Sequence, residues 1–303
     1  MSDRERRKAF RDLTRFMIGL LVGAVVLLMM VAYSAQLKND KSSVALQRAL
    51  RHPDPAIRER ALRIIARDSL MQRVNCATLV SPILDPIDRV RSAAMPVVTE
   101  SLTGDRCDRQ IFAALDTSPS TASRMLLLQA IAASGRSLGN IGHTALLRAL
   151  ENDSATRGFA AMALASTSDS SPTTLRALRR AFRSNTGSAR GEALLALLSL
   201  EPKCENERLL EQGFEDSDAE VRVLAMQAWR RLLNNPHTRC PNVSTALEML
   251  LRDKQWRVRA TAVGLILEHG TARQRELLRP LLTDSVAEVR QTVKLGLERL
   301  QLQ

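Results

Sequence analysis

An arginine recurs through this chain at intervals of about 33 residues, and this register limits the possible folds more than any other feature. Each copy follows a short turn-forming segment and an apolar or small residue, as in DPAIR at 54–58 and DAEVR at 218–222. Successive copies lie 33, 33, 33, 33, 32, 37 and 31 residues apart. A sustained period of this length predicts stacked helical repeats. The eight arginines are Arg58, Arg91, Arg124, Arg157, Arg190, Arg222, Arg259 and Arg290.

Two further columns of residues keep the same register. The residue three positions after the arginine is mostly small, and the residue seven positions after it is large and apolar. Residues at this spacing form one helical stripe, on which the small residue allows a neighbouring helix to approach closely. A second amphipathic segment precedes each turn, such as TALLRAL at 144–150. Each repeat is therefore predicted to contain a helix A, a turn and a helix B.

This pattern resembles the HEAT repeat, in particular the bacterial form with a D-x-x-V-R-x-x-A signature, over residues 44–303. Copies 1, 2, 4, 6 and 8 match well, whereas copies 3 and 5 have lost the acidic residue of the turn. Copy 7 has a longer preceding segment and carries Trp256 in its turn. The resemblance implies an all-α protein, a right-handed α-α solenoid of about eight HEAT-like repeats.

The arginine column needs a partner, because a cation in the first turn of a helix opposes the helix dipole. The candidates are the terminal carbonyl groups of helix A and a turn aspartate of an adjacent repeat. Either partner makes the column a structural ladder that joins the repeats, rather than a binding site. Four residues before the arginine, side chains suited to capping helix B recur: Asp54, Ser120, Asp153 and Asp218.

An uncharged segment at 16–35 (FMIGLLVGAVVLLMMVAYSA) precedes the repeats. Twenty helical residues cover roughly 30 Å, the thickness of the hydrocarbon core of a bilayer. Six basic residues lie before the segment, and only two lysines follow it closely, so the positive-inside rule places the N-terminus in the cytoplasm. We expect a basic cytoplasmic tail at 1–15, a transmembrane helix at 16–35 in the cell (inner) membrane, a linker at 36–43 and a periplasmic or otherwise extracytoplasmic repeat domain at 44–303.

Two other interpretations of the apolar segment remain open. Ala32, Tyr33 and Ser34 form a passable small-x-small site, which would suit a cleaved signal peptide. The segment is longer than a typical signal core, which favours an uncleaved anchor. A buried core helix is the other alternative, and the basic flank disfavours it.

The four cysteines lack the close spacing of a zinc knuckle or a thioredoxin motif. If repeats stack about 8–10 Å apart, the first two cysteines lie out of disulfide reach of the last two. We therefore expect the bridges Cys76–Cys107 and Cys204–Cys240, which fit an oxidising compartment. The alternative is four reduced, buried thiols.

Motifs of catalysis are scarce. The four histidines are scattered, and no Gly-rich phosphate loop, HExxH or GxSxG pattern occurs. We expect no catalytic residue, no metal site and no cofactor. A few HEAT-like proteins are bilin lyases, so the resemblance leaves a lyase-like solenoid enzyme as a third hypothesis.

An apolar stripe is the first candidate binding surface. Positions two and five after the arginine are expected to face the open inner surface of the solenoid, and in the middle repeats five of these positions hold large apolar residues. An exposed stripe of this kind would bind a hydrophobic segment of a partner. The alternative is that neighbouring helices bury these side chains. The residues are Leu126, Phe159, Met162, Leu195 and Leu224.

A basic stripe is the second candidate. Four arginines recur at helical spacing within LRALRRAFR at 175–183, and they would contact an acidic protein, an anionic glycan or lipid headgroups, unless they form an ordinary solvated face. They are Arg176, Arg179, Arg180 and Arg183.

These features predict a single-pass membrane scaffold whose extracytoplasmic solenoid binds a partner protein in an envelope complex. The net charge of +12 supports one alternative, a solenoid that binds nucleic acid or another polyanion. That alternative requires cytoplasmic repeats, and an aromatic content of 3% offers little for base stacking.

Overall fold

The computed structural model describes residues 24, 28–30, 43–184, 187–203, 206–235 and 244–301. Within these ranges the regular structure is α-helix and 3₁₀-helix, and no residue is in a strand. The chain divides into two compact units, Met1–Ile111 (unit 1) and Phe112–Gln303 (unit 2). The expectation of an all-α repeat protein is confirmed.

Unit 1 contains two helical hairpins. In the first, α2 (Ser43–Leu50) packs against α3 (Pro55–Arg67). In the second, α4 (Cys76–Val80) and the 3₁₀-helix η2 (Ser81–Leu84) pack against α5 (Asp88–Ser101). Helix A of the second hairpin is interrupted, unlike that of the first hairpin. Pro82 lies at the start of η2, and because proline has no N–H to donate, it cannot continue the hydrogen bonds of α4. A short 3₁₀-helix, η1 (Met71–Arg73), precedes α4, and α3 packs beside α5.

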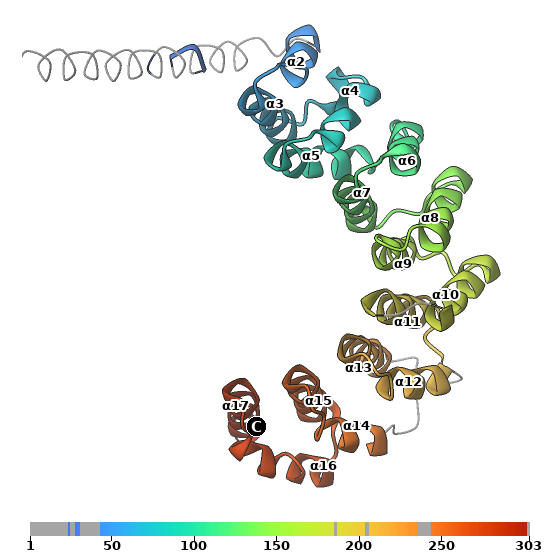
Figure 1. Ribbon diagram of the computed structural model, residues 1–303, viewed down its shortest axis with the longest axis vertical. Helices are drawn as coiled ribbons and strands as arrows, with labels where there is room; N and C mark the ends of the chain where they lie inside the picture. The colour runs from blue at the N-terminus through green and yellow to red at the C-terminus, as the bar shows by residue number, and fades with distance from the viewer. Residues whose placement is uncertain are drawn as a thin grey trace, which may run out of the picture. The chain divides into compact units, whose positions relative to one another are not determined.

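Unit 2 repeats the hairpin along its length, and Figure 1 shows its A helices and B helices in two separate layers. Each B helix contacts the B helix of the next repeat, which is the arrangement of an α-α solenoid. The B helices are α7 (Thr121–Ser134), α9 (Arg157–Ser166), α11 (Ser188–Leu200), α13 (Ala219–Leu233), α15 (Trp256–His269) and α17 (Ala287–Gln301). The A layer contains α8 (Asn140–Asn152), α10 (Pro172–Ser184), α12 (Glu207–Phe214), α14 (Ser244–Leu250), and α16 (Ala272–Glu276) followed by η4 (Arg279–Thr283). The helix α6 (Asp108–Thr117) crosses the boundary between the units.

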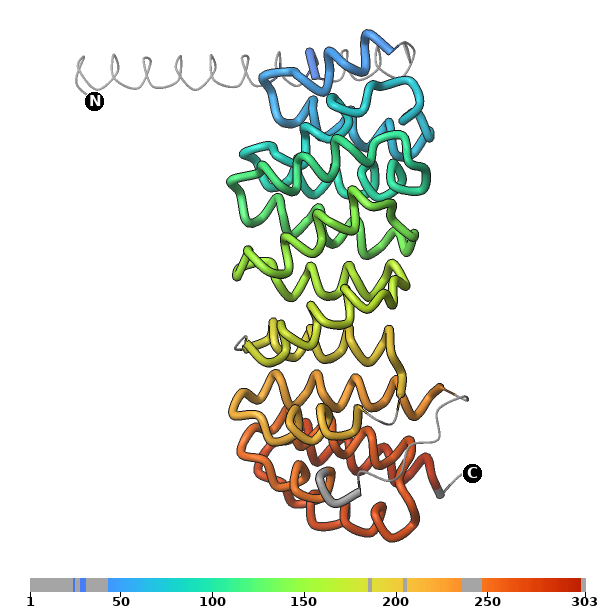
Figure 2. The backbone as a smooth tube through the Cα atoms, turned by 90° about the vertical axis from the view of Figure 1, so that its right-hand side faces the viewer, coloured from blue at the N-terminus to red at the C-terminus, as the bar shows by residue number. Residues whose placement is uncertain are grey.

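The two residue columns of the register form the core of the B layer. Every residue three positions after the arginine has no exposed surface. Seven of the eight residues seven positions after it are also buried, and the exception, Leu297, lies on the last helix. Alanine at the first position lets successive B helices approach closely. Figure 2 shows the helical hairpins of unit 2 stacked along its length. The first column is Ala61, Ala94, Leu127, Ala160, Ala193, Ala225, Ala262 and Val293.

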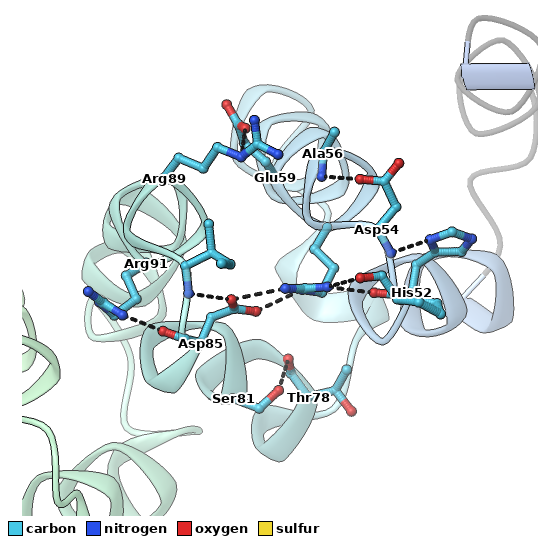
Figure 3. Close-up of polar contacts among 12 residues, drawn as sticks. His52, Asp54, Ala56, Glu59, Thr78, Ser81, Asp85, Arg89 and Arg91 are labelled. Carbon is cyan, nitrogen blue, oxygen red and sulfur yellow. Dashed lines mark hydrogen bonds and ion pairs between the residues drawn. The ribbon is translucent and has the colours of Figure 1, made fainter. Parts of the chain in front are cut away.

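The arginine ladder of unit 1 joins its two hairpins. Arg58 donates to both carboxylate oxygens of Asp85, at 2.7 and 3.0 Å, and to the carbonyl oxygens of His52 and Pro53 at 2.7 and 2.8 Å. Figure 3 shows Asp85 next to Arg91, which donates to the Asp85 carbonyl oxygen at 2.5 Å. The Asp85 side chain thus binds the preceding repeat, while its main chain binds the arginine of its own repeat.

The same double contact runs through unit 2 from α11 to α17. In each case the aspartate side chain pairs with the arginine of the preceding repeat, and its carbonyl oxygen accepts from the arginine of its own repeat. These are the two kinds of partner that the sequence predicts. The aspartates are Asp216 (with Arg190 at 2.9 Å and Arg222 at 2.7 Å), Asp253 (with Arg222 at 2.7 Å and Arg259 at 2.8 Å) and Asp284 (with Arg259 at 2.7 Å and Arg290 at 2.6 Å).

Capping of the B helices follows the sequence prediction at three of four positions. The side chains of Asp54, Ser120 and Asp218 accept backbone N–H groups at the starts of α3, α7 and α13. Asp153 is the exception, because α9 begins only at Arg157 and its N-cap residue is Thr156. Asp153 instead accepts from Nε of Arg124 at 2.6 Å, so it serves as a ladder aspartate.

One predicted disulfide lies within the described residues. Cys76 and Cys107 are bonded, with their Cα atoms 5.2 Å apart. The guanidinium of Arg106 donates to the carbonyl oxygens of Met71 and Val74 at 3.0 and 2.6 Å, so it joins the same two loops. The predicted Cys204–Cys240 bridge lies outside the described residues.

The predicted transmembrane segment at 16–35 also lies almost entirely outside the described residues. Of this segment the structure describes only Ala24 and residues 28–30, which are helical. Among the helices that are described, none has the length and apolar character needed to cross a bilayer.

The ladder gives a direct prediction for stability. Replacing Arg222 with methionine leaves the Asp253 carboxylate buried without its cation, which we expect to lower the free energy of unfolding by about 3 kcal/mol. The matched control is Arg257→Met, because Arg257 forms an exposed ion pair with Glu220 and its loss costs less than about 1 kcal/mol. Urea denaturation followed by circular dichroism measures both, and equal effects would show that the ladder contributes no more than a surface pair.

Candidate functional site on the B layer of unit 2

The predicted apolar stripe divides into two parts in the structure. Leu126 on α7 and Phe159 and Met162 on α9 are half-buried, so part of each side chain is accessible. Leu195 on α11 and Leu224 on α13 are only 3% and 6% exposed. The alternative of burial between neighbouring helices therefore describes these last two positions, and the stripe is not continuous.

A glycine on the neighbouring helix explains why Leu224 is buried. A Cβ atom at Gly191 would lie 2.6 Å from Cδ1 of Leu224 and 3.2 Å from Cα of Val221. The Leu224 side chain therefore lies directly on the α11 backbone, a position that any residue larger than glycine would block. The sequence carries this signal as an Arg-Gly pair, which occurs at Arg157-Gly158 and Arg190-Gly191.

The other Arg-Gly pair, Arg157-Gly158, receives a glutamate instead of a leucine. A Cβ atom at Gly158 would lie 3.1 Å from Cγ of Glu192, so the Glu192 side chain lies on the α9 backbone at Gly158, the residue before Phe159. Burial raises the pKa of Glu192, the negative charge of Glu220 raises it further, and Arg231 opposes both effects. A carboxylate whose charged form is disfavoured in this way is a candidate for a functional residue.

The two carboxylates are only partly neutralised by their surroundings. Glu220 pairs with Arg257 at 3.1 Å, and Arg231 donates to the hydroxyl of Ser199 at 2.8 Å. We call the resulting surface the apolar–acidic patch. It offers apolar side chains and carboxylates that can accept from a cation. This combination suits a partner segment that carries both apolar and basic side chains. Its members are Leu126, Phe159, Met162, Glu192 and Glu220.

The predicted basic stripe lies on α10, and ion pairs within unit 2 reduce its charge. Arg179 forms an ion pair with Glu201, and Arg180 lies 3.4 Å from Glu151. Arg176 is exposed and donates to the carbonyl oxygen of Pro172. Arg183 is exposed as well. Two of the four arginines are therefore paired with carboxylates within unit 2, which weakens the case for a polyanion site.

One histidine has a carboxylate partner that sequence spacing did not indicate. His143 Nδ1 lies 2.7 Å from Asp169 Oδ2, and the hydroxyls of Ser171 and Thr174 also bond to Asp169. These hydroxyls contact the carboxylate and not the imidazole, so the cluster orders the start of α10. Within the described residues no group of three or more His, Cys, Asp or Glu side chains is placed to hold a metal ion.

Comparisons with known proteins give only distant structural similarities. No protein-family model matches the chain, and no curated protein matches it. The chain is similar to an engineered protein (16% identity, 85% of this chain and 95% of that chain, TM-score 0.37). It is also similar to the karyopherin Kap121p bound to the extreme C-terminus of the protein phosphatase Cdc14p (14% identity, 84% and 33%, TM-score 0.43). A third is a designed armadillo repeat protein in complex with the peptide (KR)4 (16% identity, 84% and 97%, TM-score 0.27).

The chain spans about a third of the length of the karyopherin. At these identities and scores, the assignment of an α-α solenoid rests on the helix packing and the ladder of unit 2.

The raised pKa of Glu192 predicts a pH-dependent stability. Because the folded state favours protonated Glu192, this residue stabilises the fold least at a pH above its raised pKa, and its unfavourable effect disappears below the ordinary glutamate value of about 4.3. We expect Glu192→Gln to raise the urea midpoint at pH 8 and to raise it less at pH 5. The control is Glu288→Gln on the exposed start of α17, for which a change below about 0.5 kcal/mol is expected at both values. A pH-independent effect of Glu192→Gln would contradict the assignment.

Proposed function

We propose that this protein is a membrane-anchored scaffold whose solenoid binds a segment of a partner protein on the apolar–acidic patch. The observation that carries the proposal is the position of Glu192, a half-buried carboxylate with a raised pKa whose side chain packs on Gly158 of α9, the helix that carries the partly accessible Phe159 and Met162. A basic side chain of a partner would relieve the unfavourable charge, while apolar side chains would cover the two hydrophobic residues. The partner is expected to carry both.

An extracytoplasmic location is part of the proposal. Its support is the uncharged segment at 16–35, the basic residues before it, and a disulfide in unit 1, which suits an oxidising compartment. These features together favour a single-pass protein with its repeats in the periplasm, inside an envelope complex.

We also propose that the repeats belong to the bacterial HEAT-like type with the D-x-x-V-R signature. The support comes from the ladder. On α11, α13, α15 and α17, the signature arginine bonds to the turn of its own repeat or to the turn of the next repeat. The polyanion-binding alternative has less support than the net charge of the protein suggests, because Glu201 and Glu151 pair with the central arginines of the basic stripe. No specific observation favours a solenoid enzyme.

The topology has a simple test. Alkaline phosphatase fused after Gln303 is expected to be active, because the enzyme needs an oxidising compartment to form its disulfides. The matched control deletes residues 16–35, which should abolish the activity. A fusion that is inactive while a fluorescent protein at the same position is bright would place the repeats in the cytoplasm and would favour the polyanion alternative.

The patch is tested by a pair of substitutions on neighbouring helices. Phe159→Glu should leave the circular dichroism spectrum intact and remove the partner recovered after photo-crosslinking in whole membranes, because its side chain is partly accessible. Leu195→Glu should lower the free energy of unfolding by more than about 3 kcal/mol, because it places a charge in the core. Thr173→Glu, exposed on α10 in the other layer, should change neither property. Unchanged crosslinking with folded Phe159→Glu would exclude the patch as the binding surface.

A further inference from the structure

A pocket of about 560 Å³ lies between the last two B helices and α16, separate from the apolar–acidic patch. Its volume falls in the range of small-ligand sites. Two glycines help to form it. Gly264 on α15 has only the guanidinium of Arg230 within 4 Å of a Cβ position, so the space beside it is open. At Gly296 on α17, by contrast, a Cβ atom would lie 2.1 Å from Leu267, which packs onto that backbone.

The lining of the pocket combines apolar surface with uncompensated positive charge. Leu267 and Leu295 supply apolar walls, and Leu295 is 45% exposed. Arg275 and Arg299 also line the pocket, and within the described chain neither guanidinium has a carboxylate partner. The Nε atom of Arg275 is buried and has no hydrogen-bond acceptor among the described residues. A guanidinium without a counter-charge beside apolar surface is unfavourable, so an anionic ligand group in the pocket would stabilise this site.

The acidic residue of the pocket does not neutralise these arginines. Glu268 pairs with Arg230 at 2.9 Å and lies 3.8 Å from His269. Its charge is therefore already paired with a cation other than Arg275 and Arg299. A carboxylate has about four acceptor positions, so Glu268 can still accept an N–H group from a ligand. The Thr292 hydroxyl, which donates to the Glu288 carbonyl oxygen, can accept a second one.

We propose that this pocket binds the C-terminal residue of a partner polypeptide, with an apolar side chain against Leu267 and Leu295 and the terminal carboxylate on Arg275 and Arg299. An alkyl carboxylate would satisfy the arginines and the leucines, but it has no N–H groups for Glu268 and Thr292. The main chain of a peptide has them. The site is distinct from the patch of the proposed function and does not depend on the membrane anchor.

Fluorescence anisotropy with the full chain in nanodiscs tests the proposal. The probes are a labelled hexapeptide that ends in Ala-Leu with a free carboxylate, the same peptide with a C-terminal amide, and unlabelled octanoate as a competitor. We expect the free acid to bind at least about tenfold more tightly than the amide, because hydrogen bonds to a charged group contribute more than neutral ones. Octanoate should compete only weakly.

Variants then assign the binding to the pocket. Arg275→Gln and Arg299→Gln should each weaken binding of the free acid by about tenfold and leave the amide unaffected. Arg273→Gln is the matched control, because Arg273 is exposed on the same short helix and does not line the pocket. Equal binding of acid and amide, or an equal loss with Arg273→Gln, would overturn the proposal. Octanoate that binds as tightly as the peptide would overturn the polypeptide as the ligand. None of these outcomes affects the recovery of a crosslinked partner by the Phe159→Glu variant. A failure of this proposal is therefore distinguishable from a failure of the proposed function.

Discussion

The contact on which the solenoid depends is the aspartate that serves two arginines. Its side chain pairs with the arginine of the preceding repeat, and its carbonyl oxygen accepts from the arginine of its own repeat, as at Asp253. Because both bonds involve one residue, the turn that carries such an aspartate is fixed relative to the hairpin before it. The hydrogen bonds from Arg259 lower the pKa of Asp284, with burial opposing them, so this contact stabilises the fold at neutral pH and is lost as the pH falls through the lowered pKa. Local contacts of this kind make the stability of a solenoid a sum over neighbours.

Close stacking then decides which side chains remain accessible on the B layer. When glycine follows the ladder arginine, a side chain of the next B helix can lie directly on the backbone at that glycine. The type of that side chain then decides whether an apolar contact or a partly buried charge results. On Gly191 the residue is Leu224, which becomes core. On Gly158 it is Glu192, which keeps a partly buried charge and a raised pKa. The same glycine packing therefore gives a stabilising apolar contact in one repeat and a carboxylate with a disfavoured charge in the preceding repeat.

Much of the architecture followed from the sequence, because repeated positions report repeated environments. The arginine register, the small residue three positions later and the Cys76–Cys107 bridge could all be predicted from stacking at a fixed spacing. The sequence predicted a turn aspartate of an adjacent repeat as a partner but not its position six residues before the arginine, as at Asp85 and Asp284, because the capping residue two positions later was taken as the main signal of the turn. The burial of Leu195 and Leu224 and the 560 Å³ pocket could not be predicted. The burial of these leucines and the presence of the pocket depend on which residue of the neighbouring helix packs at each position. The repeat period does not specify that residue.

The two surfaces of unit 2 carry opposite charge, and this has a consequence for any single partner that occupies both. Glu192 lies on α11, and Arg275 and Arg299 lie at the pocket beside α15 and α17. Helix spacings of about 8–10 Å place these positions roughly 20–25 Å apart, which an extended chain covers in about seven residues. Since the terminal carboxylate belongs at the arginines, a basic residue about seven positions before the end of such a partner would reach Glu192. The order of the charges would thus fix the direction in which the partner runs, from α11 toward α17, without any contact specific to its remaining side chains.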